Sequence, residues 1–164
     1  MELRDYRSED CAEMAALFYE TIHKVNARDY TAKQLDAWAT GEIDLTEWNR
    51  SFLAHDTRVA VESGRMIGFG DMEADGYLNR LYVHWAHIGC GVGRAIVETL
   101  ESRARLRGTA KFTTHASITA KPFFARLGYT AIRPNIVVRR GVELQNFLMV
   151  KEEKFLRERQ MPLP

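Results

Sequence analysis

Hydrophobic residues in the first third of the chain recur with a helical period. The apolar positions of the first predicted helix keep the 3.6-residue spacing of one buried face: Met14, Leu17, Phe18, Ile22 and Val25. Ser8 stands where the N-cap of this helix is expected. Thr31 and Gln34 have the spacing of a capping box and predict a second, short helix, and a third helical segment is expected around Trp48.

Strand patterns fill most of the remaining chain. Residues 57–71, TRVAVESGRMIGFGD, predict a hairpin that turns at Ser63 and Gly64, and residues 77–83, YLNRLYV, predict the next strand. The elements that follow are, in chain order, a glycine-rich segment, a helix to about Arg105, a strand at 111–117, a short helix at 119–128 and a hairpin at 136–150 that turns at Arg140 and Gly141. Because no linker or repeat interrupts them, we expect one domain, residues 1–164, of mixed α/β (α+β) class.

Composition and charge limit the expected partners. The 164 residues are 46% hydrophobic and 27% charged, as in one globular domain with an ordinary core. Lysine and arginine number 23 against 22 acidic residues, so neither a nucleic acid nor a membrane is an expected partner. No apolar run reaches the roughly 20 residues of a membrane helix. Cys11 and Cys90 make a poor disulfide framework, and we expect a cytoplasmic protein with free thiols.

The glycine-rich segment HIGCGVGRAIVETLE, residues 87–101, places Gly89, Gly91 and Gly93 directly before an amphipathic helix. A Walker loop needs lysine and then serine or threonine after its last glycine, but arginine and alanine follow Gly93. A dinucleotide fingerprint counted from either of the first two glycines has arginine or isoleucine where a third small residue is required. The remaining hypotheses are an anion site for a phosphate at a helix N-terminus, or a plain turn that caps the helix.

A strand ending in Leu-Tyr-Val, the glycine segment and its helix are followed by a strand and then by the motif SITAKPFFARLGY. This order of motifs resembles the GCN5-related N-acetyltransferase (GNAT) superfamily, and the last motif is similar to the YafP-type branch. The family pattern is Gln/Arg-x-x-Gly-x-Gly/Ala, which Gly91 and Gly93 match and Ile88 does not. The resemblance runs from about Leu3 to Val150. It implies a mostly antiparallel sheet that contains a splayed parallel pair and is flanked by helices.

The resemblance implies acetyl-CoA (coenzyme A) as the cofactor. Its pantetheine arm would run along backbone groups of Leu81, Tyr82 and Val83, between strands that splay apart. The pyrophosphate would lie on the glycine segment, whose residues are Ile88, Gly89, Cys90, Gly91, Val92, Gly93 and Arg94. Ser117 stands where the family often has an asparagine that contacts the arm. Phe124 belongs to the second motif and is expected to contact the cofactor near its thioester.

The implied reaction is acyl transfer from a thioester to a primary amine. An alkyl ammonium group has a pKa of about 10 and must lose a proton before it attacks. Glu73, which lies between Asp71 and Asp75 before the central strand, is a candidate base, although the simpler explanation of this cluster is that its residues are solvated turn residues. Tyr77 stands near the position of a glutamate base in some family members. The backbone amide near Tyr82 is the expected oxyanion donor.

Phe124 replaces the tyrosine that usually protonates the departing thiolate in this family. A thiol has a pKa of about 8.5, so its thiolate leaves tolerably well without a proton. We therefore expect no dedicated acid, or a water or Tyr129 in its place. The alternative is a non-catalytic acyl-CoA-binding or regulatory module.

Other residues leave the acceptor and the assembly open. A small-molecule or peptide amine acceptor and a monomer or homodimer are expected. Arg139 and Arg140 form either a solvated turn or a contact for an acidic acceptor. His84 and His87 are three residues apart without further ligands nearby, and no metal is expected.

Overall fold

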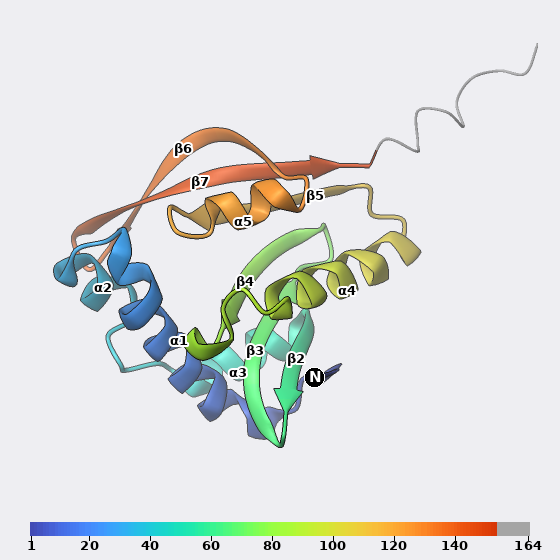
Figure 1. Ribbon diagram of the computed structural model, residues 1–164, viewed down its shortest axis with the longest axis horizontal. Helices are drawn as coiled ribbons and strands as arrows, with labels where there is room; N and C mark the ends of the chain where they lie inside the picture. The colour runs from blue at the N-terminus through green and yellow to red at the C-terminus, as the bar shows by residue number, and fades with distance from the viewer. Residues whose placement is uncertain (154–164) are drawn as a thin grey trace, which may run out of the picture.

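Seven strands form one mixed sheet in the order β1-β2-β3-β4-β5-β7-β6 in the computed structural model, which describes residues 1–153 (Figure 1). The strands are β1 (Glu2–Asp5), β2 (Asp56–Glu62), β3 (Arg65–Met72), β4 (Tyr77–Val83), β5 (Lys111–Ser117), β6 (Thr130–Arg139) and β7 (Val142–Glu152). Neighbouring strands are antiparallel except for β4 and β5, which are parallel. This arrangement confirms the expected mostly antiparallel sheet with one parallel pair.

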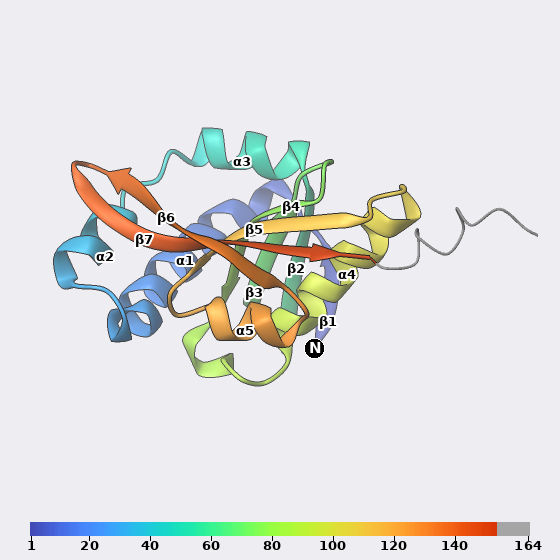
Figure 2. The ribbon, with the colours of Figure 1, turned by 90° about the horizontal axis from the view of Figure 1, so that it is seen from above.

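Helices cover both faces of the sheet, as Figure 2 shows from above. They are α1 (Cys11–Val25), α2 (Ala32–Trp38), α3 (Leu45–Ala54), α4 (Val92–Leu106) and α5 (Lys121–Arg126). Short 3-10 turns lie at η1 (Ser8–Asp10), η2 (Asn26–Arg28) and η3 (Trp85–His87). None of the helices within residues 1–153 has the length and apolar character to cross a bilayer.

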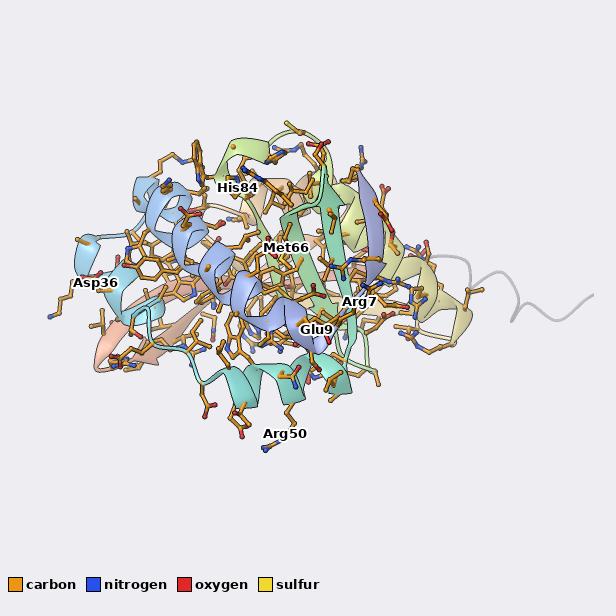
Figure 3. All side chains as sticks on the ribbon, turned by 90° about the horizontal axis from the view of Figure 1, so that it is seen from below. Arg7, Glu9, Asp36, Arg50, Met66 and His84 are labelled. Carbon is orange, nitrogen blue, oxygen red and sulfur yellow. The ribbon has the colours of Figure 1, made fainter. Side chains whose placement is uncertain are left out.

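Two hydrophobic cores lie on opposite faces. The first joins α1, α2 and α3 to the sheet, and Met14, Phe52 and Phe69 are almost fully buried in it. Figure 3 shows α1 across this face with Met66 of β3 beneath it, and the backbone amide of Met66 donates a hydrogen bond to Glu13 at 3.2 Å. The second core packs α4 and α5 against the other face. Burial of both faces explains why β3 is apolar along almost its whole length.

Most of the predicted elements are present, with local differences at their ends. Both hairpin turns are confirmed, since the two turn residues of each have positive φ: Ser63 with Gly64, and Arg140 with Gly141. The last hairpin begins at Thr130 and not at residue 136. Its first strand is an edge strand, where Pro134 costs no ladder hydrogen bond.

The predicted cap of the second helix is confirmed, but that of the first is not. Thr31 and Gln34 form the expected capping box, in which the Gln34 amide donates to Thr31 Oγ1 at 3.2 Å and the Thr31 amide donates to Gln34 Oε1 at 2.9 Å. The prediction of Ser8 as N-cap is wrong. The carboxylate of Asp10 accepts from the Arg7 amide at 2.8 Å and pairs with Arg4 of the unpredicted strand β1.

Candidate active site

A β-bulge in β4 separates the two central strands. Arg80 pairs with Asp71 of β3 and Leu78 pairs with Met72, so Asn79 is an extra residue on β4. On the other side, β4 pairs with β5 only at Tyr77 with Thr113 and at Leu78 with Thr114. The parallel pairing thus ends where the bulge begins. The splay implied by the sequence motifs is present, and it leaves backbone groups of both strands without a ladder partner.

A cavity of about 710 Å³ fills the space that the splay opens. Its walls are the open end of β4, the open end of β5, the glycine segment, α5 and the end of α1. Most of the residues expected to bind the cofactor line it: Leu81, Tyr82, Val83, Ile88, Gly89, Gly91, Val92, Gly93, Arg94, Ser117 and Phe124. The side chain of Cys90 is exposed and is outside this lining. The cavity therefore brings together both sequence motifs.

The glycine segment has the backbone conformation that an anion site requires. Gly89 and Gly91 have φ values of +79° and +85°, and a Cβ at either position would meet no atom within 4 Å. Gly91 is the N-cap of α4, so the amides of Val92, Gly93 and Arg94 begin the helix without intrahelical carbonyl partners. Open space in front of unpaired amides at the positive end of a helix suits a phosphate.

Some of the polar side chains next to the glycine segment already make hydrogen bonds within the protein, and others do not. Arg94 is exposed and its Nε donates to Glu98 at 3.0 Å, so its charge is shared with that carboxylate. Ser117 Oγ accepts from the Ala120 amide at 3.0 Å. Within residues 1–153, the buried hydroxyl of Thr119 has no hydrogen-bond partner, and Thr119 lines the cavity.

A second cavity of about 240 Å³ lies between the two central strands and the β6–β7 hairpin. The two cavities share five lining residues: Trp38, Asn79, Tyr82, His115 and Ser117. These residues surround the gap between β4 and β5. A group placed in the gap could therefore be approached from both cavities.

Tyr77 and His115 form a hydrogen-bonded pair at this gap. The hydroxyl of Tyr77 lies 2.9 Å from Nδ1 of His115, and the alternation of β5 buries Phe112, Thr114 and Ala116 on the face opposite His115. Burial, together with the positive charge of Arg133, lowers the pKa of His115 below its ordinary value. His115 is therefore mainly neutral near pH 7 and can accept a proton. Sequence reasoning missed it because the pair forms only through tertiary contact.

The acidic cluster before β4 is engaged in structural contacts. Asp71 is completely buried, and it accepts hydrogen bonds from Arg80 at 2.9 and 2.8 Å and lies 2.7 Å from Nδ1 of His55. Asp75 accepts from the Tyr77 amide at 3.0 Å, as a turn residue does. Glu73 lies 3.7 Å from Nε2 of His55 and lines neither cavity. The structure therefore does not bring Glu73 into the gap.

Two tyrosine hydroxyls near the site are held in their neutral form. Burial raises the pKa of Tyr82, and burial followed by the negative charge of Glu73 raises the pKa of Tyr77. Tyr82 also packs edge-on against Phe18, with ring centroids 4.8 Å apart. Both phenols can donate hydrogen bonds at neutral pH.

Phe124 and Tyr129 both belong to the core beneath the cavity. Phe124 is 4% exposed and its ring centroid lies 5.3 Å from that of Tyr129. The hydroxyl of Tyr129 donates to the buried carboxylate of Glu101 at 2.9 Å, and burial raises the pKa of Tyr129. Tyr129 therefore packs, and it is not part of the cavity lining.

The sequence and the fold match known acetyltransferases. The family described as the acetyltransferase (GNAT) domain matches residues 26–151. The uncharacterised N-acetyltransferase YafP of Escherichia coli K12 is 28% identical over 149 residues, which cover 91% of this chain and 94% of YafP. A GCN5-related N-acetyltransferase from Rhodopseudomonas palustris is 34% identical, with a TM-score of 0.88 over 92% of this chain and 94% of that chain. The PaiA N-acetyltransferase of Thermoplasma acidophilum, solved in complex with coenzyme A, shares the fold at 15% identity, with a TM-score of 0.77 over 92% of this chain and 98% of that chain.

Proposed function

Because the chain belongs to the GNAT acetyltransferase family, we propose that it transfers an acetyl group from acetyl-CoA to a primary amine by direct attack on the thioester. The observation that carries this proposal is the gap between β4 and β5, where the 710 Å³ cavity meets the 240 Å³ cavity. The larger cavity, at about 710 Å³, extends from the gap to the glycine segment, where a phosphate of a nucleotide cofactor would bind. The smaller one gives an amine access to the same point.

The cofactor would bind through backbone groups at both ends of the larger cavity. The amides of Val92, Gly93 and Arg94 would hold the pyrophosphate at the start of α4. The pantetheine arm would follow the unpaired edge of β4 at Leu81 to Val83, as an added strand does. Coenzyme A bound to PaiA, which has the same fold, supports this choice of cofactor.

His115 is the base that we propose for the amine. In the tautomer with its proton on Nδ1, His115 donates to the oxygen of Tyr77, and Nε2 keeps a free lone pair. Nε2 would take a proton from the ammonium group, and the neutral amine would then attack the thioester carbon. The lowered pKa of His115 keeps it neutral for this role. Glu73 would act only through its charge on Tyr77.

The tetrahedral intermediate would be stabilised by a backbone amide of β4 near Tyr82. When the intermediate collapses, the carbon–sulfur bond breaks, the electron pair leaves with the sulfur, and the attacking nitrogen releases its second surplus proton to water, which leaves a neutral amide. Phe124 carries no exchangeable proton, so the coenzyme A thiolate would depart unprotonated or take a proton from water. The thiol pKa of about 8.5 makes this departure feasible.

Thiol release from acetyl-CoA in the presence of an amine panel tests the proposed function. We expect coenzyme A binding by calorimetry and amine-dependent thiol release, with mass spectrometry showing the acetylated amine. Absence of coenzyme A binding would contradict the proposal. Binding without transfer to any amine would instead identify the acyl-CoA-binding module that Phe124 leaves open.

His115→Gln tests the assignment of the base. The variant should lose most of kcat while it keeps its affinity for coenzyme A, because the side chain acts on the amine and not on the phosphates. In the wild type, kcat/KM should fall as the pH drops through the lowered pKa of His115. A variant with the same acidic limb as the wild type would contradict the role of His115.

A further inference from the structure

The lining of the smaller cavity is rich in amide side chains and carries little charge. Amide side chains from β4, β6 and β7 line it: Asn79, Asn135, Gln145 and Asn146. Its ionisable residues other than tyrosine are His115, which is mainly neutral, and Arg139 of β6. No aspartate or glutamate of residues 1–153 is part of this lining. A wall with one fixed positive charge and no carboxylate disfavours a polycationic acceptor.

Arg139, an exposed residue at the end of β6, is the source of this charge. Within the described residues 1–153, no carboxylate lies within ion-pair distance of it. Its charge nevertheless reaches the site, since it opposes the effect of burial on the pKa of both Tyr77 and Tyr82. A guanidinium has the planar donors that bind a carboxylate with two parallel hydrogen bonds.

We propose that the acceptor is a small amino-carboxylate, such as an α-amino acid, whose carboxylate binds Arg139 while its amine lies at His115. This proposal rests on the proposed function, because it identifies the acceptor of that reaction. The volume of the cavity fits a small acceptor, since about 240 Å³ is below the roughly 300 to 1,000 Å³ of most small-molecule sites. The amide side chains supply further hydrogen bonds to polar atoms of such a ligand.

The test compares matched acceptors that differ in one charge. A panel of L-amino acids is assayed beside the corresponding L-amino acid carboxamides, together with uncharged alkyl amines, and kcat/KM is measured by thiol release. We expect at least one amino acid to exceed its carboxamide by about tenfold or more, the size of effect that a hydrogen-bonded charge pair gives. Comparable or higher values for the carboxamides throughout the panel would overturn the inference.

Two variants of Arg139 test whether this residue causes the preference for amino acids over their carboxamides. Arg139→Gln should remove the preference, so that kcat/KM becomes similar for each amino acid and its carboxamide, whereas Arg139→Lys should retain part of the preference. Arg140→Gln is the matched control, because it also removes one positive charge. Arg140 is the next residue in the chain, lies at the hairpin turn and does not line the cavity. This control variant should keep the full preference.

The outcomes separate this inference from the proposed function. If no amine in the panel releases thiol, the proposed function fails. If alkyl amines are acetylated but amino acids are not, or if Arg139→Gln keeps the preference, the enzyme assignment stands and the inference about the acceptor is wrong.

Discussion

Gly91 combines two properties that a larger residue cannot provide at the start of α4. Its φ of +85° lies in the left-handed region, and the space where a side chain would stand is open. Under the proposed function, that open space belongs to the phosphates of the cofactor. A carboxylate placed there would both fill the space and repel an anion.

Gly91→Glu should therefore weaken coenzyme A binding by about tenfold or more, equivalent to ~1.4 kcal/mol, as measured by calorimetry. Gly108→Glu is the matched control, because Gly108 also has open space around it and a φ of +94° but lies beyond the other end of α4. Both variants should lose similar stability through backbone strain. Equal affinities in the two variants would remove the phosphate from this segment.

Phe124 offers a second prediction at the scale of one residue. If the thiolate leaves without a side-chain acid, Phe124→Tyr should leave kcat unchanged or raise it only modestly, because it adds a donor to a step that does not require one. Steady-state kinetics of the two proteins would measure this change. A wild-type alkaline limb in kcat that disappears in Tyr129→Phe, with coenzyme A affinity retained, would show that Tyr129 is the acid after all.

Single residues could be predicted from the sequence where a local motif fixes their role. The glycines and Phe124 belong to contiguous patterns, and the larger cavity brings them together as expected. His115 and Arg139 could not be predicted as partners of one cavity, because β5 and β6 meet there only through the order of strands in the sheet. Glu73 stands in the sequence where a base is expected, but it lies outside both cavities. It lies beside His55, which follows α3, and this contact is not visible in the sequence.

At the scale of elements, the bulge at Asn79 lies where the pairing of β4 with β5 ends and the gap begins. The strand at residues 77–83 was predicted, but the bulge was not, because a single extra residue is visible only against the partner strand. The effect of the bulge on the sequence pattern is that Leu78 and Leu81, three residues apart, contact the same core. Regular alternation would have placed these two leucines on opposite faces.

Buried charges tie α3 to β3 and β4 next to this bulge. Arg80 of β4 binds Asp71 of β3 and also Ser51 of α3, and His55 follows α3 and contacts the same carboxylate. The hydrogen bond to Asp71 raises the pKa of His55 above its ordinary value. Protonated His55 therefore stabilises the folded chain.

The pH dependence of this contact has a definite sign. The stabilisation is complete below the unfolded pKa of about 6.5 and is lost as the pH rises through the higher folded pKa. We expect His55→Gln to lower the free energy of unfolding more at pH 5.5 than at pH 8.5, measured by urea denaturation. An equal loss at both pH values would show that His55 contributes no charge-dependent stability.

The whole molecule consists of two half-sheets, β1 to β4 and β5 to β7, and the splay leaves them joined by few strand contacts. β4 and β5 are linked by two residue pairs, by the hydrogen bond from Thr114 Oγ1 to the Leu78 carbonyl at 2.9 Å, and by the hydrogen bond between Tyr77 and His115. The fold class was predictable because two motifs occur in the family's order. The four-residue strand β1 was not predicted, since its pairing with β2 spans more than fifty residues.

A cofactor bound between the half-sheets should stabilise the molecule as a unit. Coenzyme A at a hundred times its Kd should contribute about 2.7 kcal/mol, which corresponds to a rise in Tm of roughly 5 to 10 °C for a chain of this size. Thermal unfolding with and without coenzyme A measures the shift. Gly91→Glu should show a smaller shift at the same concentration, and no shift in the wild type at saturation would contradict the proposed binding mode.

The overlap of the two cavities has a consequence for the order of events during turnover. Only the larger cavity is lined by the glycine segment, only the smaller one by the β6–β7 hairpin, and the residues around the gap are common to both. Under the proposed function, neither substrate would have to leave before the other binds, and no side chain would need to carry the acetyl group between them. The arrangement fits a ternary complex, which gives intersecting lines in double-reciprocal plots, and parallel lines would indicate a covalent acetyl-enzyme.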